Sequence, residues 1–445
     1  MTISAEADVE TTLARSKNRP AAPQETPPER AVSGLLDLAG TSAFVRTAGL
    51  RPGPDDVFVP AALIKQYGLR RGDQIDGAAH PPGTSGPARN GQAGNGQAGI
   101  GQDRNAREKR ATLTRVDTVN AMPAASAQHR PAFDGLTPLY ADRRIRLEAG
   151  SSSPSARIID LVSPIGRGQR GLIVSPPKAG KTELLKEIAV AITTGDPELH
   201  LIMVLVGERP EEVTDIRRSV RGEVVSSTFD HGAQEHIMVA ELAIERAKRL
   251  VELGRDVVVL LDSITRLARA YNIAAPATSR ILAGGVATSA LQPPRAFLGA
   301  ARNVEYGGSL TILSTALIET GSRMDDVFFE EFKGTGNMEL RLRRDLAEKR
   351  LFPAIDVAAS GTRREDLLMA PDEYAASGKL RRGLSGLDPQ QALELLLDRT
   401  RDTSSNAEFL LQIQGADSHA ADRPAVLRLA RPLSAGRRTP SGWLT

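Results

Sequence analysis

The stretch Ser175-Pro-Pro-Lys-Ala-Gly-Lys-Thr182 decides the fold class of this chain. The apolar run Gly171-Leu-Ile-Val174 precedes it and a helical pattern begins at Gly180, so we predict a strand, a loop and a helix in succession. Such a loop can direct backbone N–H groups at phosphate oxygens. Ser175 stands where the usual pattern has glycine, but the Gly-Lys-Thr end is intact. We therefore expect a nucleotide site here rather than an ordinary glycine turn.

Short β-branched runs and helical stretches alternate after this loop. We expect strands at residues 201–206 and 257–261, a helix from Pro210, and an amphipathic helix over residues 233–253. This alternation predicts a mostly parallel sheet covered by helices, which is an α/β fold.

Three side chains are candidates for holding phosphate and metal. Lys181 can neutralise the β- and γ-phosphates, and the Thr182 hydroxyl can ligate Mg²⁺. Asp262 ends an apolar strand at the edge where parallel strands open toward ligand, which suits a carboxylate on the metal side. Taken alone, an aspartate at this position is more often a helix cap.

Glu208 is the candidate general base. It follows the strand at 201–206 and should lie at the same edge of the sheet. Its alternative role is to compensate the dipole of the helix that begins at Pro210, but Glu211 and Glu212 already supply charge to that first turn. We therefore expect Glu208 to orient and activate water.

The composition bounds the other classes of function. With 445 residues the chain is long enough for two or three domains, because single cores seldom exceed about 250 to 300 residues. The absence of cysteine excludes disulfides, thiolate metal sites and cysteine nucleophiles, and the six histidines show no paired metal spacing. The formal charge of +3 means that local basic clusters must hold any polyanion. The sequence has no apolar run long enough for a membrane span and begins with acidic residues, so we expect a cytoplasmic protein with no membrane partner.

The pattern along the chain predicts five segments. We expect a disordered arm at 1–32, a β-rich domain at 33–118 with a Gly/Asn/Gln-rich insertion at 81–107, a linker at 119–156, the α/β domain at 157–414 and a tail at 415–445. The short β-type runs of the second segment suggest a small barrel.

Four blocks of sequence resemble the transcription termination factor Rho family. They are Lys178-Ala-Gly-Lys-Thr182, Glu208-Arg-Pro-Glu-Glu-Val-Thr214, Asp262-Ser-Ile-Thr-Arg-Leu-Ala-Arg-Ala-Tyr-Asn272 and Glu331-Phe-Lys-Gly-Thr-Gly-Asn337. Catalytic subunits of rotary ATP synthases share several of these blocks, whereas residues 267–272 and the Gly284-Gly285 pair distinguish this family.

The resemblance implies a fold and an activity. The fold is a small OB-fold or cold-shock-like β-barrel followed by a RecA-like P-loop NTPase domain. The activity is that of a homohexameric, RNA-dependent ATPase and helicase, with ATP and Mg²⁺ as cofactors. It would move along single-stranded RNA and terminate transcription by dissociating the RNA polymerase transcription complex.

The resemblance also assigns nucleotide contacts. Arg363, within Gly361-Thr-Arg-Arg364, matches an arginine finger that a neighbouring subunit supplies, and Arg350 is a second arginine candidate. Without the resemblance, Arg363 would be read as part of a solvated basic face and Phe352 as a core residue. The implied cofactor-binding residues, besides Lys181 and Thr182, are Gly166, Arg167, Gly168, Gln169, Arg170, Gly171, Lys178, Ala179, Gly180, Glu183, Arg209 and the adenine-stacking Phe352.

RNA contacts are implied in two places. Two loops, at 279–285 and 320–324, resemble those that line the ring channel, and they would hold RNA through Arg280, Gly284, Gly285 and Arg323. The alternative is a pair of mobile surface loops. On the barrel, the matching residues are Phe44, Arg46, Asp56, Phe58 and Glu108.

The barrel departs from the family at two ring positions. Ser42 and Arg110 stand where stacking aromatics are usual, and each base–aromatic stack is worth about 1 to 3 kcal/mol. Arg110 can partly compensate, because a guanidinium plane also stacks on bases. Phe44 and Phe58 could instead belong to the barrel core.

Two alternatives to the leading function stay open. One is an RNA-binding hexameric ATPase without efficient termination, suggested by the loss of two aromatic side chains from the barrel. The other is a rotary or secretion-type ATPase, suggested by the shared Gly207-Glu208-Arg209 block.

Overall fold

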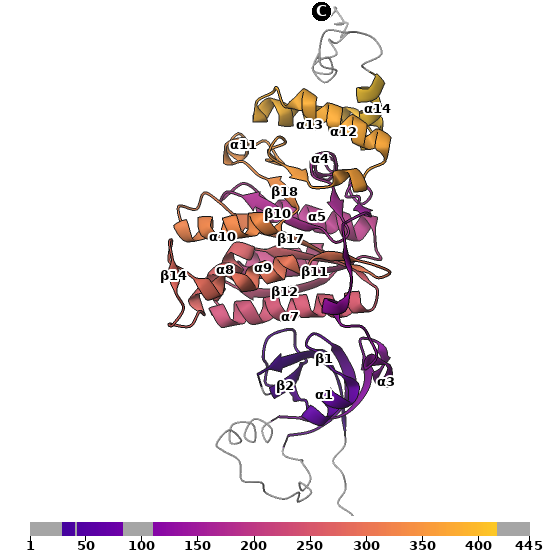
Figure 1. Cartoon of the computed structure of the whole chain (residues 1–445), viewed down its shortest axis with the longest axis vertical. Coiled ribbons are helices and arrows are strands. Elements are labelled where there is room, and N and C mark those ends of the chain that lie inside the picture. Colours follow the sequence, from indigo (N-terminus) through magenta and orange to yellow (C-terminus); the bar gives the residue numbers. More distant parts are fainter. Residues whose placement is uncertain (1–28, 41, 83–109, 416–445) are drawn as a thin grey trace, which may run out of the picture.

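A computed structural model describes residues 29–40, 42–82 and 110–415 of the chain. A β-barrel lies at one end, a layered α/β domain in the middle and a group of helices at the other end (Figure 1). Most of the expected arm, insertion and tail lie outside the described residues.

The first domain is a small closed barrel. Its sheet has the order β3-β2-β1-β4-β5-β6, and an additional pairing of β3 with β5 closes it. The barrel core includes Val32, Leu36, Val45, Ile75 and Leu113. Its elements are β1 (Arg30–Ala39), β2 (Ser42–Arg46), β3 (Val57–Phe58), α1 (Ala61–Tyr67), β4 (Gln74–His80), β5 (Thr112–Val119), β6 (Met122–Pro123) and α3 (Ala124–Ala127).

The barrel begins earlier than expected. Arg30, Ala31 and Val32 already pair with β4, and the Val32 side chain is buried, so the predicted arm is wrong for residues 30–32. Val32 is the one large apolar residue among residues 30–34, so this end of the strand has no clear β pattern in the sequence.

The second domain is a nine-stranded sheet with the main order β12-β11-β13-β17-β10-β18-β19. Neighbouring strands from β12 to β18 run parallel, and β19 at the end pairs antiparallel with β18. Strands β16 and β7 continue from β17 as antiparallel additions. The strands are β7 (Pro138–Leu139), β10 (Arg170–Ser175), β11 (His200–Glu208), β12 (Glu223–Thr228), β13 (Asp256–Asp262), β16 (Arg302–Val304), β17 (Ser309–Leu317), β18 (Met338–Arg341) and β19 (Gly361–Thr362).

Helices cover both faces of this sheet and make two cores. One core unites α4 (Pro154–Val162), α5 (Lys181–Gly195) and α6 (Pro210–Ser219) with the C-terminal helices. The other unites α7 (Ala233–Glu252), α8 (Ile264–Ile273), α9 (Gln292–Gly299) and α10 (Arg323–Thr335). The predicted α/β sandwich is therefore confirmed, with strands within about two residues of their expected limits.

The remaining elements complete the edges. The C-terminal helices are α11 (Arg344–Glu348), α12 (Pro371–Leu384), α13 (Pro389–Asp402) and α14 (Asn406–Gly415). Two two-stranded sheets are β8 (Arg144–Ile145) with β9 (Ile165–Gly166), and the hairpin of β14 (Ile281–Leu282) with β15 (Val286–Ala287). Of the described helices, none is both long and apolar enough to cross a membrane.

The expected linker at 119–156 is largely built into the two domains. Strand β7 extends the large sheet and Phe133 is buried against the α7 side of the core. These short additions depend on backbone pairing and on distant partners, so they leave little local pattern in the sequence.

Candidate nucleotide site and nucleic-acid interface

The phosphate-loop sequence connects β10 to α5, as expected. Gly180 has a φ of 88°, in the left-handed region, and α5 begins at the next residue, Lys181. Strands β11 and β13 of the same sheet, separated from β10 by β17, end at Glu208 and Asp262, so three strand ends lie on one side of the sheet. This is the side where open parallel sheets bind ligands.

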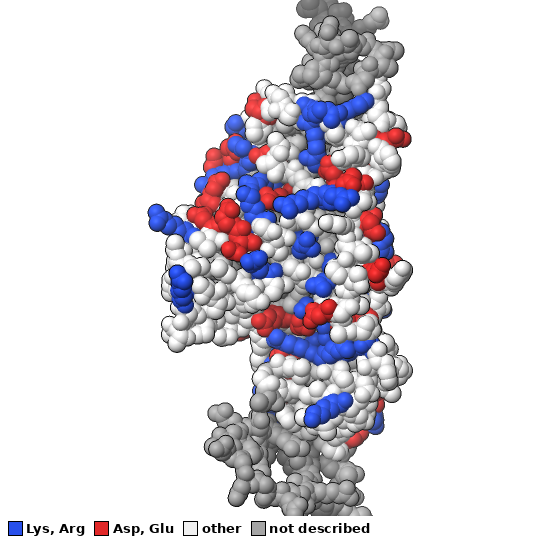
Figure 2. Space-filling model, viewed as in Figure 1, with Lys and Arg blue, Asp and Glu red and all other residues white. Residues whose placement is uncertain are grey.

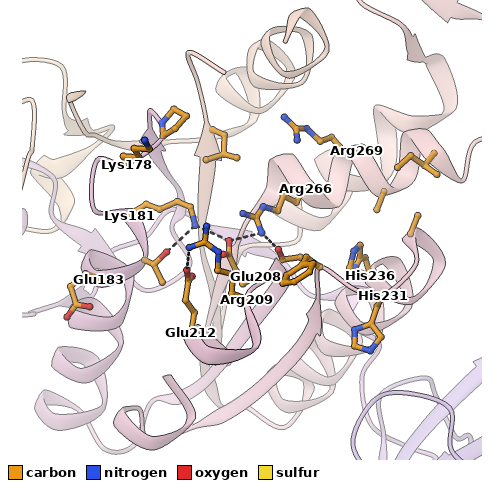
Figure 3. Close-up of a pocket in the computed structure, with 18 of the residues that line it drawn as sticks. Lys178, Lys181, Glu183, Glu208, Arg209, Glu212, His231, His236, Arg266 and Arg269 are labelled. Atoms are coloured by element: carbon orange, nitrogen blue, oxygen red, sulfur yellow. Dashed lines mark hydrogen bonds and ion pairs between the residues drawn. The ribbon is translucent and has the colours of Figure 1, made fainter. Parts of the chain in front are cut away.

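Lys181, Glu208 and Asp262 form a compact charged cluster, of which Figure 3 shows Lys181 and Glu208. The Lys181 ammonium lies 2.8 Å from both carboxylate oxygens of Asp262 and 3.0 Å from Glu208 Oε1. Thr315 on β17 donates a 2.6 Å hydrogen bond to Asp262, and the Thr182 hydroxyl lies 3.5 Å from the same carboxylate. The structure therefore brings together all four residues that the sequence assigned to phosphate and metal chemistry.

Arg266 is a member of the cluster that sequence reasoning missed. Its guanidinium lies 3.2 Å from Glu208 Oε1 and also donates to the carbonyl oxygen of Gly207. Gly207 has a φ of 68° at a register shift in β11, and a Cβ there would lie 3.1 Å from Arg266. Glycine at 207 thus leaves room for Arg266 to orient Glu208.

Burial and charge set the protonation of the cluster. Burial raises the pKa of the Glu208 carboxyl and the Asp262 carboxylate raises it further, although Lys181 and Arg266 oppose both effects. Burial lowers the pKa of the Lys181 amine, but Asp262 and Glu208 outweigh burial and the net shift of its pKa is upward. Lys181 is therefore held as a cation, and Glu208 is a stronger base than an exposed glutamate.

A cavity of about 890 Å³ opens above the cluster. Lys178, Glu183 and Arg209 line it, as does Gly180, and Arg209 pairs with Glu212 at 3.4 Å. A second, mainly apolar cavity of about 450 Å³ adjoins Ala179 and Gly180 and is lined by Phe352, which is 48% exposed. Phe352 is therefore not a core side chain, and it can present a ring face to a flat ligand.

Within one chain the segment from Gly166 to Gly171 does not lie at this site, so the nucleotide contacts of Gly166, Arg167, Gly168, Gln169, Arg170 and Gly171 stay predictions. β10 runs from Arg170 to Ser175. The 166–171 segment therefore lies at the N-terminal end of this strand, roughly 15 to 20 Å from the phosphate loop at its C-terminal end. There Gly168 N–H donates to Thr311, and Arg167 pairs with Asp256 at the start of β13.

Arg363 and Arg350 also lie outside the cluster. Both side chains are exposed, and neither lines the large cavity. Arg363 follows β19, and its backbone N–H donates to Asn337, whose side chain contacts Gln169. Its positive charge, after burial and Arg302, contributes to lowering the pKa of Arg170. Arg363 and the 166–171 segment thus share one edge of the molecule.

The barrel carries an aromatic platform. Phe44 and Phe58 meet edge to face with ring centroids 6.0 Å apart, and both rings are half-buried rather than part of the barrel core. The Arg110 guanidinium lies 5.1 Å from the Phe44 centroid. Arg110 therefore extends the platform with a flat guanidinium group.

Arg46 and Asp56 support the platform from below. Arg46 is 5% exposed and pairs with Asp37 at 2.6 Å and with Asp56 at 2.5 Å. One oxygen of Asp56, Oδ1, is buried with no hydrogen-bond partner among the described residues. Glu108, the remaining barrel prediction, lies outside the described residues.

The two predicted channel loops lie against each other. Gly284 and Gly285 form the turn between β14 and β15, and a Cβ at Gly284 would come within 3.0 Å of the Arg323 carbonyl oxygen. Asn272 fixes the hairpin, since its side chain donates to Gly285 and accepts from the Ala287 N–H. Arg280 is exposed, as is Arg323, and Figure 2 shows basic side chains projecting at the edge where β14 lies in Figure 1.

Two family models match the chain. Residues 32–125 match the Rho termination factor RNA-binding domain, and residues 155–362 match the nucleotide-binding domain of the ATP synthase alpha/beta family. The first match covers the barrel and the second covers the sheet that carries the cluster.

Curated relatives extend over most of the chain. A transcription termination factor Rho from Micrococcus luteus is 60% identical and one from Streptomyces lividans 59%, in each case over 86% of this chain. This chain spans about half the length of those two, 54% and 52%. A Rho from Streptosporangium roseum is 53% identical over 91% of this chain and 99% of its own length.

A solved structure shares the fold. It comes from a study of a prototypical ATPase of the type III secretion system of pathogenic bacteria, with 23% identity, a TM-score of 0.53, and coverage of 67% of this chain and 88% of that one.

Proposed function

The chain belongs to the transcription termination factor Rho family, and from this premise we propose that it is an RNA-dependent ATPase that moves along single-stranded RNA and ends transcription by dissociating the RNA polymerase complex. The observation that carries the proposal is the presence, on one chain, of the Lys181–Glu208–Asp262 cluster and the Phe44–Phe58 platform. The first suits phosphoryl chemistry and the second suits unpaired bases.

The cluster supports hydrolysis of ATP by its own side chains. Lys181 would exchange its contacts with the two carboxylates for contacts with phosphate, which leaves Glu208 free to accept a proton from water. Arg266 holds Glu208 in place through a 3.2 Å contact. Phe352 offers a stacking surface for the adenine beside Gly180.

Mg²⁺ suits the donors present. Thr182 and Asp262 offer oxygen ligands, the kind that Mg²⁺ prefers, and Thr315 orients the carboxylate. The ion would neutralise charge on the phosphates when ATP binds.

A homohexameric ring would complete the site. Arg363 and the 166–171 segment share an edge far from the phosphate loop, so only another copy can bring them to it. A heterologous, head-to-tail interface closes into a ring when its rotation permits. We propose that Arg363 stabilises the transferring phosphoryl group of the neighbouring subunit, with Arg350 as a second candidate.

The deciding experiment measures ATP hydrolysis by the full chain with poly(C), with other homopolymers and without RNA. We expect strong stimulation by at least one RNA. Hydrolysis that is indifferent to every RNA would instead favour a secretion-type or rotary ATPase.

One observation favours a second candidate, an RNA-binding ATPase without efficient termination. Ser42 offers no ring, and Arg110 is partly engaged by the Gly53 carbonyl at 3.1 Å and by Asp56 at 3.3 Å. A transcription assay with purified RNA polymerase separates the two, because RNA-stimulated hydrolysis without transcript release would support only the second.

A further inference from the structure

A series of polar contacts connects the Phe44–Phe58 platform of the barrel to the β14–β15 hairpin, which we call the channel hairpin. The series consists of Asp37, Arg71, Glu241 and Tyr271, which we call the Arg71 relay. Arg71 Nε donates to Asp37 Oδ1 at 3.0 Å, and its Nη1 donates to Glu241 Oε2 at 2.9 Å. Tyr271 donates to the other oxygen of Glu241 at 2.8 Å. Arg71 thus bridges an acid of the barrel and an acid of α7.

At its barrel end the relay lies directly beneath the platform. Asp37 on β1 faces Phe44 on β2 as its cross-strand partner, so the two share a face of the sheet. The second oxygen of Asp37 holds Arg46, whose guanidinium lies 5.6 Å from the Phe44 centroid. If a stacked base displaces Phe44, the positions of Arg46 and Asp37 should therefore change as well.

At its other end the relay reaches helix α8, which lies between the nucleotide cluster and the β14–β15 hairpin. Tyr271 lies in the last turn of α8, next to Asn272, which holds the β14–β15 hairpin. The helix begins two residues after Asp262 of the nucleotide cluster. Near that end, the backbone N–H of Leu317 donates to the Thr265 hydroxyl oxygen at 2.9 Å. One rigid helix thus connects the nucleotide cluster to the channel hairpin.

The barrel is docked by other contacts as well. A Cβ at Gly72 would lie 2.5 Å from backbone atoms of Glu245 and Arg246, so the barrel turn packs directly on α7. Arg70 pairs with Glu252 at 3.0 Å. Figure 2 shows charged side chains of both signs along this border, below α7 in Figure 1. Loss of Arg71 alone leaves these docking contacts in place.

We propose that Arg71 is a positioning residue that transmits RNA binding on the barrel to the channel hairpin through Glu241 and Tyr271. This inference rests on the proposed function, because it needs ATP hydrolysis that responds to RNA. Its physical content is a coupling free energy between two sites, carried by a packed element that both sites contact.

The test compares Arg71→Ala with Arg70→Ala in the full chain. The two arginines are neighbours in one turn and are similarly exposed, 25% and 27%. We expect Arg71→Ala to lower the RNA-stimulated kcat about 10-fold, within the usual range of coupling between sites. Its basal kcat, its KM for ATP and its Kd for single-stranded poly(C) should stay within about 2-fold. Arg70→Ala should keep the full stimulation.

Two further variants test the route of the coupling. Tyr271→Phe removes only the hydroxyl and should weaken the stimulation in the same direction. Glu241→Gln added to Arg71→Ala should cause no further loss, since residues in one pathway are not additive. A full additional loss would place Glu241 outside the relay.

The outcomes distinguish a failure of the Arg71 relay from a failure of the proposed function. Wild-type protein without RNA stimulation would overturn both. Stimulated wild type with equally stimulated Arg71→Ala would overturn the relay alone. A parallel loss of RNA affinity and of melting temperature in Arg71→Ala would also overturn it, because that pattern belongs to a residue that only holds the barrel together.

Discussion

At the scale of single residues, Glu208 is the most informative position in the nucleotide cluster, because its carboxylate contacts Lys181 and Arg266 together. Glu208→Gln keeps the shape of the side chain but cannot accept a proton. We expect ATP to bind with nearly unchanged affinity while kcat falls about 100-fold or more, the usual contribution of a general base. Binding of a fluorescent ATP analogue and phosphate release in the presence of RNA measure the two quantities.

A matched control is Glu212→Gln in the same cavity. Glu212 pairs with Arg209 and has no contact with Lys181 among the described residues. It should retain most of the activity. Equal losses in the two variants would contradict the assignment of Glu208 as the base.

The pH dependence of hydrolysis follows from the same carboxyl. Glu208 must be ionised to accept a proton, and its pKa is raised above the ordinary value of 4.5, first by burial. Activity should therefore fall as the pH drops through this raised pKa, so the acidic limb of kcat lies above the range of an exposed glutamate. A limb at or below pH 4.5 would show that another group controls the rate.

At the scale of elements, the barrel strands are held by an ion-pair triad. Arg46 on β2 contacts Asp37 of β1 and Asp56 of the loop before β3, and all three side chains are buried. Removing the arginine leaves two buried carboxylates without their main cation, which costs about 3 to 5 kcal/mol. We expect Arg46→Ala to lower the protection of β1 and β2 amides by that amount in hydrogen exchange.

Arg110 offers the contrast in the same barrel. Its side chain is 30% exposed and contacts Asp56 at 3.3 Å, so its ion pair is worth about 1 kcal/mol or less. Arg110→Ala should leave amide protection nearly unchanged but weaken poly(C) binding, because it removes a stacking plane over Phe44. The opposite ranking of the two variants would show that Arg110 is structural and Arg46 is not.

The channel hairpin gives a prediction about loop contact. Gly284 and Gly285 both have positive φ, but only a Cβ at Gly284 meets another segment, Arg323, at 3.0 Å. Alanine at either position carries backbone strain of about 1 kcal/mol. We expect Gly284→Ala to lower RNA-stimulated hydrolysis about 5-fold more than Gly285→Ala, since only it pushes the two loops apart. ATPase assays at saturating RNA compare them, and equal effects would mean that the contact is irrelevant.

The sequence predicted the local part of this architecture well. The strand–loop–helix around Lys181 is encoded by contiguous residues, so its limits were correct within about one residue. Glu208 and Asp262 were also found, because parallel strands end at a common edge.

The errors concern contacts between distant segments. Thr315 lies in a fully buried strand and Arg266 on a helix, and neither position has a local signal of its role. The sequence did not show that the 166–171 segment lies at the start of β10, away from the phosphate loop of the same chain, because a glycine-rich pattern does not say at which end of a strand it lies. Arg46 was assigned to RNA by resemblance alone, and the sequence did not show that its guanidinium is buried between Asp37 and Asp56.

At the scale of the whole molecule, the distance between Lys181 and Arg363 sets the requirement for assembly. Arg363 lies outside the cavity above Lys181, so in the proposed ring each site combines Lys181 of one copy with Arg363 of the next. Lys181→Ala and Arg363→Ala should each abolish hydrolysis when assembled alone. Each variant, however, keeps the residue that the other lacks.

Mixing the two inactive variants should therefore restore activity. In a randomly mixed 1:1 ring, about one interface in four joins an intact Lys181 to an intact Arg363, because each copy contributes one face to each head-to-tail contact. We expect RNA-stimulated phosphate release of up to about a quarter of the wild-type rate. The rate should be lower still if the sites must hydrolyse ATP one after another around the ring. The proteins are mixed after dissociation and then reassembled, with Lys181→Ala mixed with wild type as the control. A mixture as inactive as its parts, with reassembly confirmed by mass, would mean that Arg363 does not act across the interface.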